Sequence, residues 1–305
     1  MINTPTVLLL GAGASMPFKF PSGPRLLYDV VNTTKGRKGW LAQTFGLLEQ
    51  EIEDFGQTLF RSGVTSVDAF LEHRRDLVDL GKILIALCLT PHEVPDRLWA
   101  EGHDTDNWYK LLFRKMNAPF QRFGENNLSV ITYNYDRSLE YFLHTSLMNL
   151  YGQDSDACWS QLDKIPIVHL HGQLADLRQR PYSGEPEPGG IRQSADGIRI
   201  IHEDMDDDPQ FKQAHQMLIA AERVYFVGFG YHPDNIRRLN MEHAKEVRAE
   251  YIELGSIRNN HQRVLGTVHG FTGTEIANLK KRTSNLINFV NTKSVGFFRN
   301  NAPLD

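Results

Sequence analysis

The chain has 305 residues, 41% hydrophobic and 10% aromatic, which is enough apolar side chain for one large domain or two modest ones. Its formal net charge of −4 excludes the broad basic face that non-specific nucleic-acid binding requires, so no direct nucleic-acid partner is expected. The two cysteines, Cys88 and Cys158, lie far apart and supply neither a disulfide framework nor a zinc ribbon. No apolar run reaches about 18 residues, so we expect no membrane span, no signal peptide and a cytoplasmic location.

A short apolar run near the start of the chain predicts the first strand of a parallel sheet. Thr6–Leu10 is bounded by Pro5 and Gly11, which is typical of a central strand buried on both faces. Similar stretches occur at Ser129–Thr132, Ile165–Leu170, Gly197–Ile201 and Arg223–Val227, with Glu250–Leu254 as a sixth candidate. Because long segments separate them, crossover connections are expected, and the fold class is predicted as α/β with a doubly wound parallel sheet.

The interval from Lys35 to Asn127 is too long for a single crossover helix and predicts a helical insertion packed over the sheet. Apolar residues recur at helical spacing between Phe45 and Phe60, Ser66 is a candidate N-cap for a helix to about Leu89, and Trp108–Phe123 predicts a third helix. We therefore expect a core of residues 1–34 and 128–258, an insertion of 35–127, and a C-terminal helical tail, 259–305, packed on the core. Within these parts, Thr274–Asn291 is predicted as helix and Gln179–Gln193 as an exposed, mobile loop.

A glycine-rich turn, Gly11-Ala12-Gly13-Ala14-Ser15, directly follows the first strand. Backbone N–H groups at such a position can cradle a pyrophosphate, although an ordinary tight turn explains the same residues. The dinucleotide fingerprint of dehydrogenases is incomplete, because Met16 stands where a third small residue belongs and Asp29 falls inside a predicted helix. The turn therefore favours nucleotide binding without favouring hydride transfer.

Polar residues follow three of the predicted strands. The segments are Thr132-Tyr133-Asn134-Tyr135-Asp136, His169-Leu170-His171-Gly172 and Gly228-Phe229-Gly230-Tyr231-His232-Pro233-Asp234-Asn235. Each alone is explained by helix caps, a strand-end histidine or a tight turn. Ligands in open α/β sheets bind beyond the carboxyl ends of the strands, so the three segments together predict a binding site there.

The GAGAS turn, TYNYD, His171-Gly172 and GFG with a following acidic residue together resemble the sirtuin superfamily, and more narrowly the sirtuin-like domains of bacterial anti-phage defence proteins. The resemblance runs from residue 6 to about 255 and implies a Rossmann-like NAD-binding core. It implies that Asn134 contacts the nicotinamide-side ribose or the attacking water and that His171 is the base. The implied NAD-binding residues are Gly11, Ala12, Gly13 and Ser15 at the phosphates, Thr132 and Asp136 near the nicotinamide, and Gly228, Gly230 and Asp234 on the adenosine side. Protein-deacylating sirtuins usually carry a four-cysteine zinc module, which two cysteines cannot form, so peptide deacylation is disfavoured.

The resulting hypothesis is an NAD glycohydrolase that uses NAD as substrate and water as nucleophile, without a metal. The run His202–Asp208 lacks the alternating ligand spacing of a calcium loop and is predicted as a solvated face or a helix start. By analogy the chain would deplete NAD in abortive infection, as a homo-oligomer or with a partner such as a HerA-like ATPase or a short Argonaute-type protein. A non-catalytic module that binds NAD or ADP-ribose remains the alternative, with a protein deacylase third.

Overall fold

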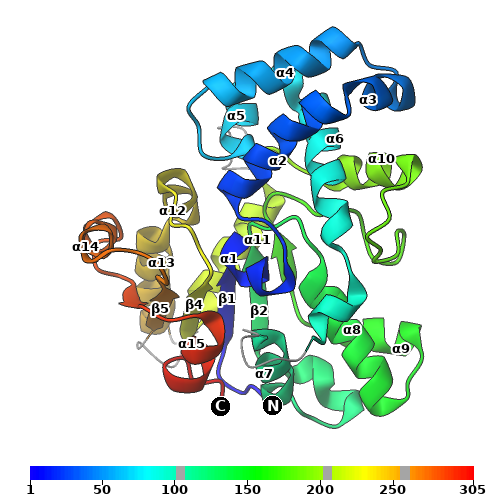
Figure 1. Ribbon diagram of the computed structural model, residues 1–305. Coiled ribbons are helices and arrows are strands. Elements are labelled where there is room, and N and C mark those ends of the chain that lie inside the picture. Colours follow the sequence, from blue (N-terminus) through cyan, green and yellow to red (C-terminus); the bar gives the residue numbers. More distant parts are fainter. Residues whose placement is uncertain (101–106, 202–207, 255–261) are drawn as a thin grey trace.

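The computed structural model describes residues 1–100, 107–201, 208–254 and 262–305, and a parallel sheet lies at the centre of these residues (Figure 1). Its strands are β1 (Thr6–Leu10), β2 (Leu128–Thr132), β3 (Ile167–His169), β4 (Arg223–Val227), β5 (Arg263–Thr267) and β6 (Asn288–Val290). Their order is β3-β2-β1-β4-β5-β6 and every neighbouring pair is parallel. This is the order of a Rossmann-like doubly wound sheet, so the predicted fold class and the central place of β1 are confirmed.

The sheet is buried on both faces because side chains alternate along each strand. Leu8 and Leu10 of β1 belong to one apolar cluster, whereas Val7 and Leu9 belong to the other. The first cluster includes residues of α7, α8, α15 and several helices between β1 and β2, and the second includes residues of α11, α13 and α14. The continuous apolar character of β1 follows from this double covering.

The helices before β2 are α1 (Ala12–Ser15), α2 (Gly23–Gly36), α3 (Lys38–Phe45), α4 (Glu49–Arg61), α5 (Val67–His73), α6 (Val78–Leu89) and α7 (Trp108–Lys115). Those that follow are α8 (Ser138–Tyr151), α9 (Ser155–Leu162), α10 (Pro188–Gly197), α11 (Pro209–Ala220), α12 (Pro233–Leu239), α13 (Met241–Glu253), α14 (Gly273–Arg282) and α15 (Ser294–Asn300). We call α2–α6 with α10 the helical layer, since α2 packs on α4 and α6, and α10 packs on α6. In the described part of the chain, every helix is too short or too polar to traverse a bilayer.

Two predicted strands are wrong. Gly197 ends α10, and the residues after it form an isolated antiparallel bridge between Ile198 and Gly172 of the loop that follows β3. Glu250–Leu254 overlaps the end of α13, where Leu254 is 76% exposed and is therefore no core strand residue. The apolar residues of this stretch belong to a helix whose buried positions recur every three or four residues.

The segment after residue 259, predicted as a helical tail, supplies two strands of the sheet. β5 and β6 extend the sheet beyond β4, and α14 accounts for only the first part of the predicted helix Thr274–Asn291. β6 is the edge strand, has three residues and has no buried position, so it needs no continuous apolar run. In β5, Arg263 and Thr267 flank the apolar residues.

Helix boundaries also differ from expectation. The Ser66 hydroxyl accepts from the Ala69 amide as the predicted cap, but the helix breaks at Arg74 before α6 begins. The predicted helix from Trp108 ends at Lys115, ahead of Pro119, and a separate 3-10 helix, Phe120–Glu125, follows it.

The stretch Gln179–Gln193 is not the exposed loop that its composition predicts. Arg180 and Tyr182 are buried, and α10 begins at Pro188. Residues 202–207 of the acidic run lie outside the described residues. The last residue of that run, Asp208, caps α11 by accepting from the Gln210 and Phe211 amides.

A buried ion cluster ties the helical layer to the loops that follow β2 and β3. Arg137 donates from Nε and Nη2 to the two carboxylate oxygens of Glu93, at 2.9 and 2.8 Å, and both side chains are fully buried. Arg180 donates to the same carboxylate at 2.5 Å, and its carbonyl accepts from Arg137. A single carboxylate thus compensates two buried guanidinium groups, so it holds three distant chain segments together.

We predict that Glu93→Gln destabilises the protein by about 3–5 kcal/mol, because two buried cations lose their carboxylate. Urea unfolding of the variant measures the loss. The control is Glu125→Gln, whose pair with Arg122 is about half exposed and should contribute less than about 1 kcal/mol. Equal losses in the two variants would contradict the prediction.

Candidate functional site

The sheet has a topological switch point between β1 and β4. From β1 the chain winds to β2 and β3 on one side, then returns to place β4, β5 and β6 on the other. The Gly11–Ser15 turn follows β1 and the Gly228–Asp234 segment follows β4, so both lie at the carboxyl edge beside the switch point. Open α/β sheets bind ligands in the crevice at this position.

The glycines at the switch point allow two backbones to approach each other closely. The Gly13 amide donates to the Gly228 carbonyl at 2.8 Å, and a Cβ on Gly11 or Gly13 would lie 2.8 Å from the atoms of Gly228. Gly228 itself has a φ of +59°, and a Cβ there would lie 2.0 Å from the Ala14 amide nitrogen. Packing within the protein therefore explains why these positions are glycines, whether or not a ligand binds there.

Two predicted residues of the β4 segment stand apart from this contact. Gly230 is exposed and has no atom near the place where a Cβ would be built. The Asp234 side chain is 45% exposed and pairs with Arg237 at 3.4 Å and His232 at 3.5 Å. The structure therefore places Gly228 against the glycine turn but not Gly230 or Asp234.

Asn134 joins the end of β2 to the glycine turn. Its side-chain Nδ2 donates to the Gly11 carbonyl at 3.0 Å and to the Ser15 hydroxyl at 3.1 Å. The Thr132 hydroxyl accepts from the Asn134 amide at 3.0 Å and so fixes the turn after β2. Thr132 and Asn134 at the end of β2 are thus brought to the Gly11–Ser15 turn after β1, as the sequence predicted.

Asp136, two residues after Asn134, lies below the surface of the candidate site. It is buried, and its carboxylate accepts from the amide and the hydroxyl of Ser138 at the start of α8. Burial raises its pKa, while the hydrogen bonds from Ser138 and Ser15 lower it, and the net shift is upward. The geometry therefore gives Asp136 a supporting place under the Ser15 side of the turn.

His171 is buried beside the aromatic rings of Tyr133 and Tyr135, whose centroids lie 5.5 and 5.9 Å from that of the imidazole. Burial lowers the pKa of His171, so the neutral imidazole that a general base requires predominates near pH 7.

His169, the last residue of β3, is placed differently. Its ring nitrogens lie 2.9 Å from the Asn134 carbonyl oxygen and 2.5 Å from Glu140 Oε1. Burial lowers the pKa of His169, but the Glu140 carboxylate raises it more. His169 supports the Asn134 turn from below.

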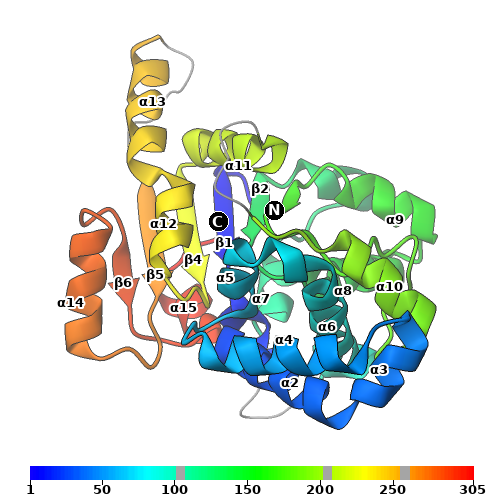
Figure 2. The same ribbon diagram turned by 90° about the horizontal axis from the view of Figure 1, so that it is seen from above.

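Helix α5 lies over the candidate site and contributes two acidic residues that the sequence analysis did not single out. Figure 2 shows α5 between the rest of the helical layer and α12. Asp68 Oδ1 accepts from the Tyr135 hydroxyl and lies 3.8 Å from His171 Nδ1, and Glu72 makes two 2.8 Å contacts to Arg238 of α12. Spacing of four residues places both acids on one face of the helix, but no sequence signal indicates that this face meets the sheet edge.

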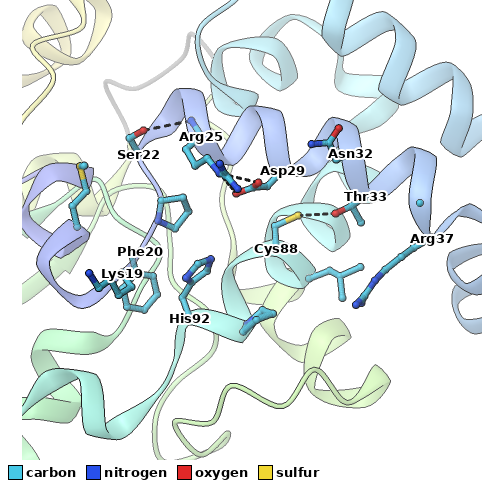
Figure 3. Close-up of a pocket in the computed structure, with 15 residues that line it drawn as sticks. Lys19, Phe20, Ser22, Arg25, Asp29, Asn32, Thr33, Arg37, Cys88 and His92 are labelled. Carbon is cyan, nitrogen blue, oxygen red and sulfur yellow. Dashed lines mark hydrogen bonds and ion pairs between the residues drawn. The ribbon is translucent and has the colours of Figure 1, made fainter. Parts of the chain in front are cut away.

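A cavity of about 860 Å³ lies beside the site and not within it (Figure 3). Its walls come from the segment after α1, one face of α2, and the end of α6 with the residues after it. Arg25, which follows the glycine turn in sequence, points into this cavity and pairs with Asp29 at 3.0 Å. Neither Asn134 nor His171 lines it. Within the described ranges, no group of three or more His, Cys, Asp or Glu residues is placed to hold a metal ion.

In a comparison with known families, the family model described as a SIR2-like domain matches residues 128–265. The match includes β2 with Asn134, β3 with His171, and β4 with the segment that follows it. No curated protein matches the chain.

We predict that Gly228→Ala destabilises the protein, since the left-handed backbone alone costs a non-glycine residue roughly 1–2 kcal/mol and the new Cβ would meet the Gly13–Ala14 backbone. The matched control is Gly230→Ala, which should change stability by less than about 0.5 kcal/mol. Chemical denaturation of both variants tests this. Similar stability of the two variants would show that the two turns do not pack as described.

Proposed function

We propose that the protein hydrolyses NAD to nicotinamide and ADP-ribose. The match of residues 128–265 to a SIR2-like domain supports a function related to NAD. One observation carries the proposal. Asn134 and His171 follow adjacent strands at the carboxyl edge of a doubly wound sheet, and Asn134 binds the glycine turn at its switch point. A polar orienting group, a neutral imidazole and a nucleotide-binding position are thus combined at one edge.

The chemistry of NAD suits this set of groups. Nicotinamide is bound to the ribose as a pyridinium cation, so it leaves as a neutral molecule and needs no acid to protonate it. Water attacks the anomeric carbon as the glycosidic bond breaks, and the bonding electron pair goes to the pyridine nitrogen. The proton lost by the water passes to His171, and Asn134 orients the ribose or the water through its amide. The charge therefore balances with one base and no acid.

The covered state of His171 supports the idea of an enzyme that is restrained until activated. The His171 side chain is 6% exposed, and the contacts of α5 with Tyr135 and Arg238 cover the edge where a dinucleotide would enter. The contact between α5 and α12 must therefore open before NAD reaches the imidazole, while Asp68 of α5 stays beside His171. Such restraint suits an activity that would otherwise consume the NAD pool of the cell.

On this basis we assign the protein, as part of the proposal, to anti-phage defence by NAD depletion. Activation would come through self-association or through a partner such as a HerA-like ATPase or a short Argonaute-type protein. Either event could open the contact between α5 and α12 by binding the helical layer to which α5 belongs.

The first test is to incubate the purified chain with NAD and to follow nicotinamide and ADP-ribose by chromatography. We expect His171→Ala and Asn134→Ala to reduce hydrolysis by about 10²- to 10⁴-fold, the usual contribution of a positioned acid–base group. The exposed residues His243 and Asn149 provide matched control variants, His243→Ala and Asn149→Ala, that should retain the parent rate.

If the parent chain releases no nicotinamide, calorimetry with NAD separates the remaining possibilities. Binding without turnover would favour a restrained enzyme or a module that senses NAD or ADP-ribose. Absence of binding would contradict the NAD proposal as a whole.

The defence role makes a separate prediction in bacteria that express the chain. On phage infection, cellular NAD should fall and plaque formation should be reduced, and both effects should disappear with Asn134→Ala. Loss of NAD in uninfected cells alone would support the hydrolase but not a phage-triggered role.

A further inference from the structure

The buried imidazole of His171 has one unsatisfied nitrogen that faces a carboxylate. Among the described residues, His171 Nδ1 is buried without a hydrogen-bond partner, and Asp68 Oδ1 lies 3.8 Å from it. A buried polar atom without a partner destabilises the folded state, and a catalytic role is one explanation for its presence in a native protein. We propose that Asp68 is a positioning residue for His171, holding its imidazole as the Nδ1–H tautomer with Nε2 free to act as the base. This inference rests on the proposed NAD hydrolysis.

The Asp68 carboxylate is held in place from several directions. Tyr135, which directly follows Asn134, donates its hydroxyl to Asp68 Oδ1. The helix that carries Asp68 begins at the Ser66 cap and buries Val67, Phe70 and Leu71. One turn further along, the two Glu72 contacts to Arg238 fix the same helix to α12. Asp68 is therefore presented to His171 by a rigid element and not by a loop.

The separation of 3.8 Å is about 1 Å longer than a hydrogen bond between an imidazole N–H and a carboxylate. Catalytic contacts are often long before substrate binds and shorten in the complex. A carboxylate at Nδ1 accepts a hydrogen bond from the Nδ1–H group, so the proton stays on Nδ1 and the lone pair remains on Nε2. This arrangement also stabilises the imidazolium that forms when His171 takes the proton of the water.

The charges around His171 determine the direction of the pH effect. Burial lowers its pKa, the carboxylates of Asp68 and Glu72 on α5 raise it, and the guanidinium groups of Arg238 and Arg199 lower it. The side chains of Tyr133 and Tyr135 face the ring as neutral phenols, because burial raises the pKa of both well above neutrality. Replacing Asp68 by a neutral residue removes a group that raises the pKa, so the pKa of His171 must fall further.

The test compares Asp68→Asn with Asp79→Asn, which makes the same chemical change at an exposed position near the start of α6. In Asp68→Asn we expect kcat for NAD hydrolysis to fall at least about 10-fold with KM little changed, because the group acts on the base and not on substrate binding. The acidic limb of the kcat/KM profile should move to lower pH. Asp79→Asn should match the parent protein in rate and profile.

Nitrogen-15 NMR of the histidine side chains provides a readout that does not depend on turnover. The parent protein should show His171 protonated at Nδ1, and Asp68→Asn should lower its pKa and mix the tautomers. Tyr135→Phe, which keeps the carboxylate but removes the hydroxyl that holds it, should produce a smaller change in the same direction.

The outcomes separate the two proposals. A parent protein without NAD hydrolysis but with the expected tautomer and pKa change would reject the proposed function and keep the Asp68–His171 pairing. An active parent whose Asp68→Asn variant retains kcat and the pH profile would reject the positioning role and keep the function. An Nε2–H tautomer in the parent protein would also reject the positioning role.

Discussion

The site depends first on the contact between the turn after β1 and the turn after β4. Gly13 donates to the Gly228 carbonyl at a distance that no side chain on either residue would allow, and Gly228 adopts a left-handed backbone to reach it. This contact sets the position of the Gly11 carbonyl and the Ser15 hydroxyl, to which Asn134 binds. His169 then supports the Asn134 carbonyl from the next strand. A single backbone approach therefore places groups from β1, β2 and β4 in a fixed arrangement.

A second layer of constraint comes from the helical layer, which does more than cover the sheet. Through α5 it brings acidic side chains to Tyr135, His171 and Arg238, and through Glu93 it compensates the buried Arg137 beside Asp136. Both connections join charged groups in poorly solvated surroundings, where an unpaired partner is costly. Movement of the helical layer would thus change the surroundings of the candidate base and the loop that carries the orienting amide. One movement of the helical layer would therefore change both the access to the site and the charges around it.

The surroundings of the two strand-end histidines show how position, not residue type, decides chemistry. His169 lies against Glu140 and has a raised pKa, whereas His171 is enclosed by phenol rings and has a lowered pKa. His169 is the last residue of β3 and His171 lies in the turn that follows it, so the two side chains meet different neighbours. The lowered pKa of His171 favours its neutral imidazole near pH 7, which is the form that accepts a proton.

Much of the architecture followed from local sequence. The run Thr6–Leu10, the bounds of β4 and the Ser66 cap are determined by residues adjacent in the chain, because burial on both faces demands an apolar run and a helix start demands a side-chain acceptor. The carboxyl-edge position of Asn134 and His171 followed as well, since residues after parallel strands share one edge. Tertiary structure alone decided that Gly197–Ile201 stays outside the sheet, that β5 and β6 extend it, and that Asp68 meets His171. These outcomes depend on contacts between segments about 25 to 100 residues apart, and no local pattern specifies which distant partner a strand edge or a helix face will find.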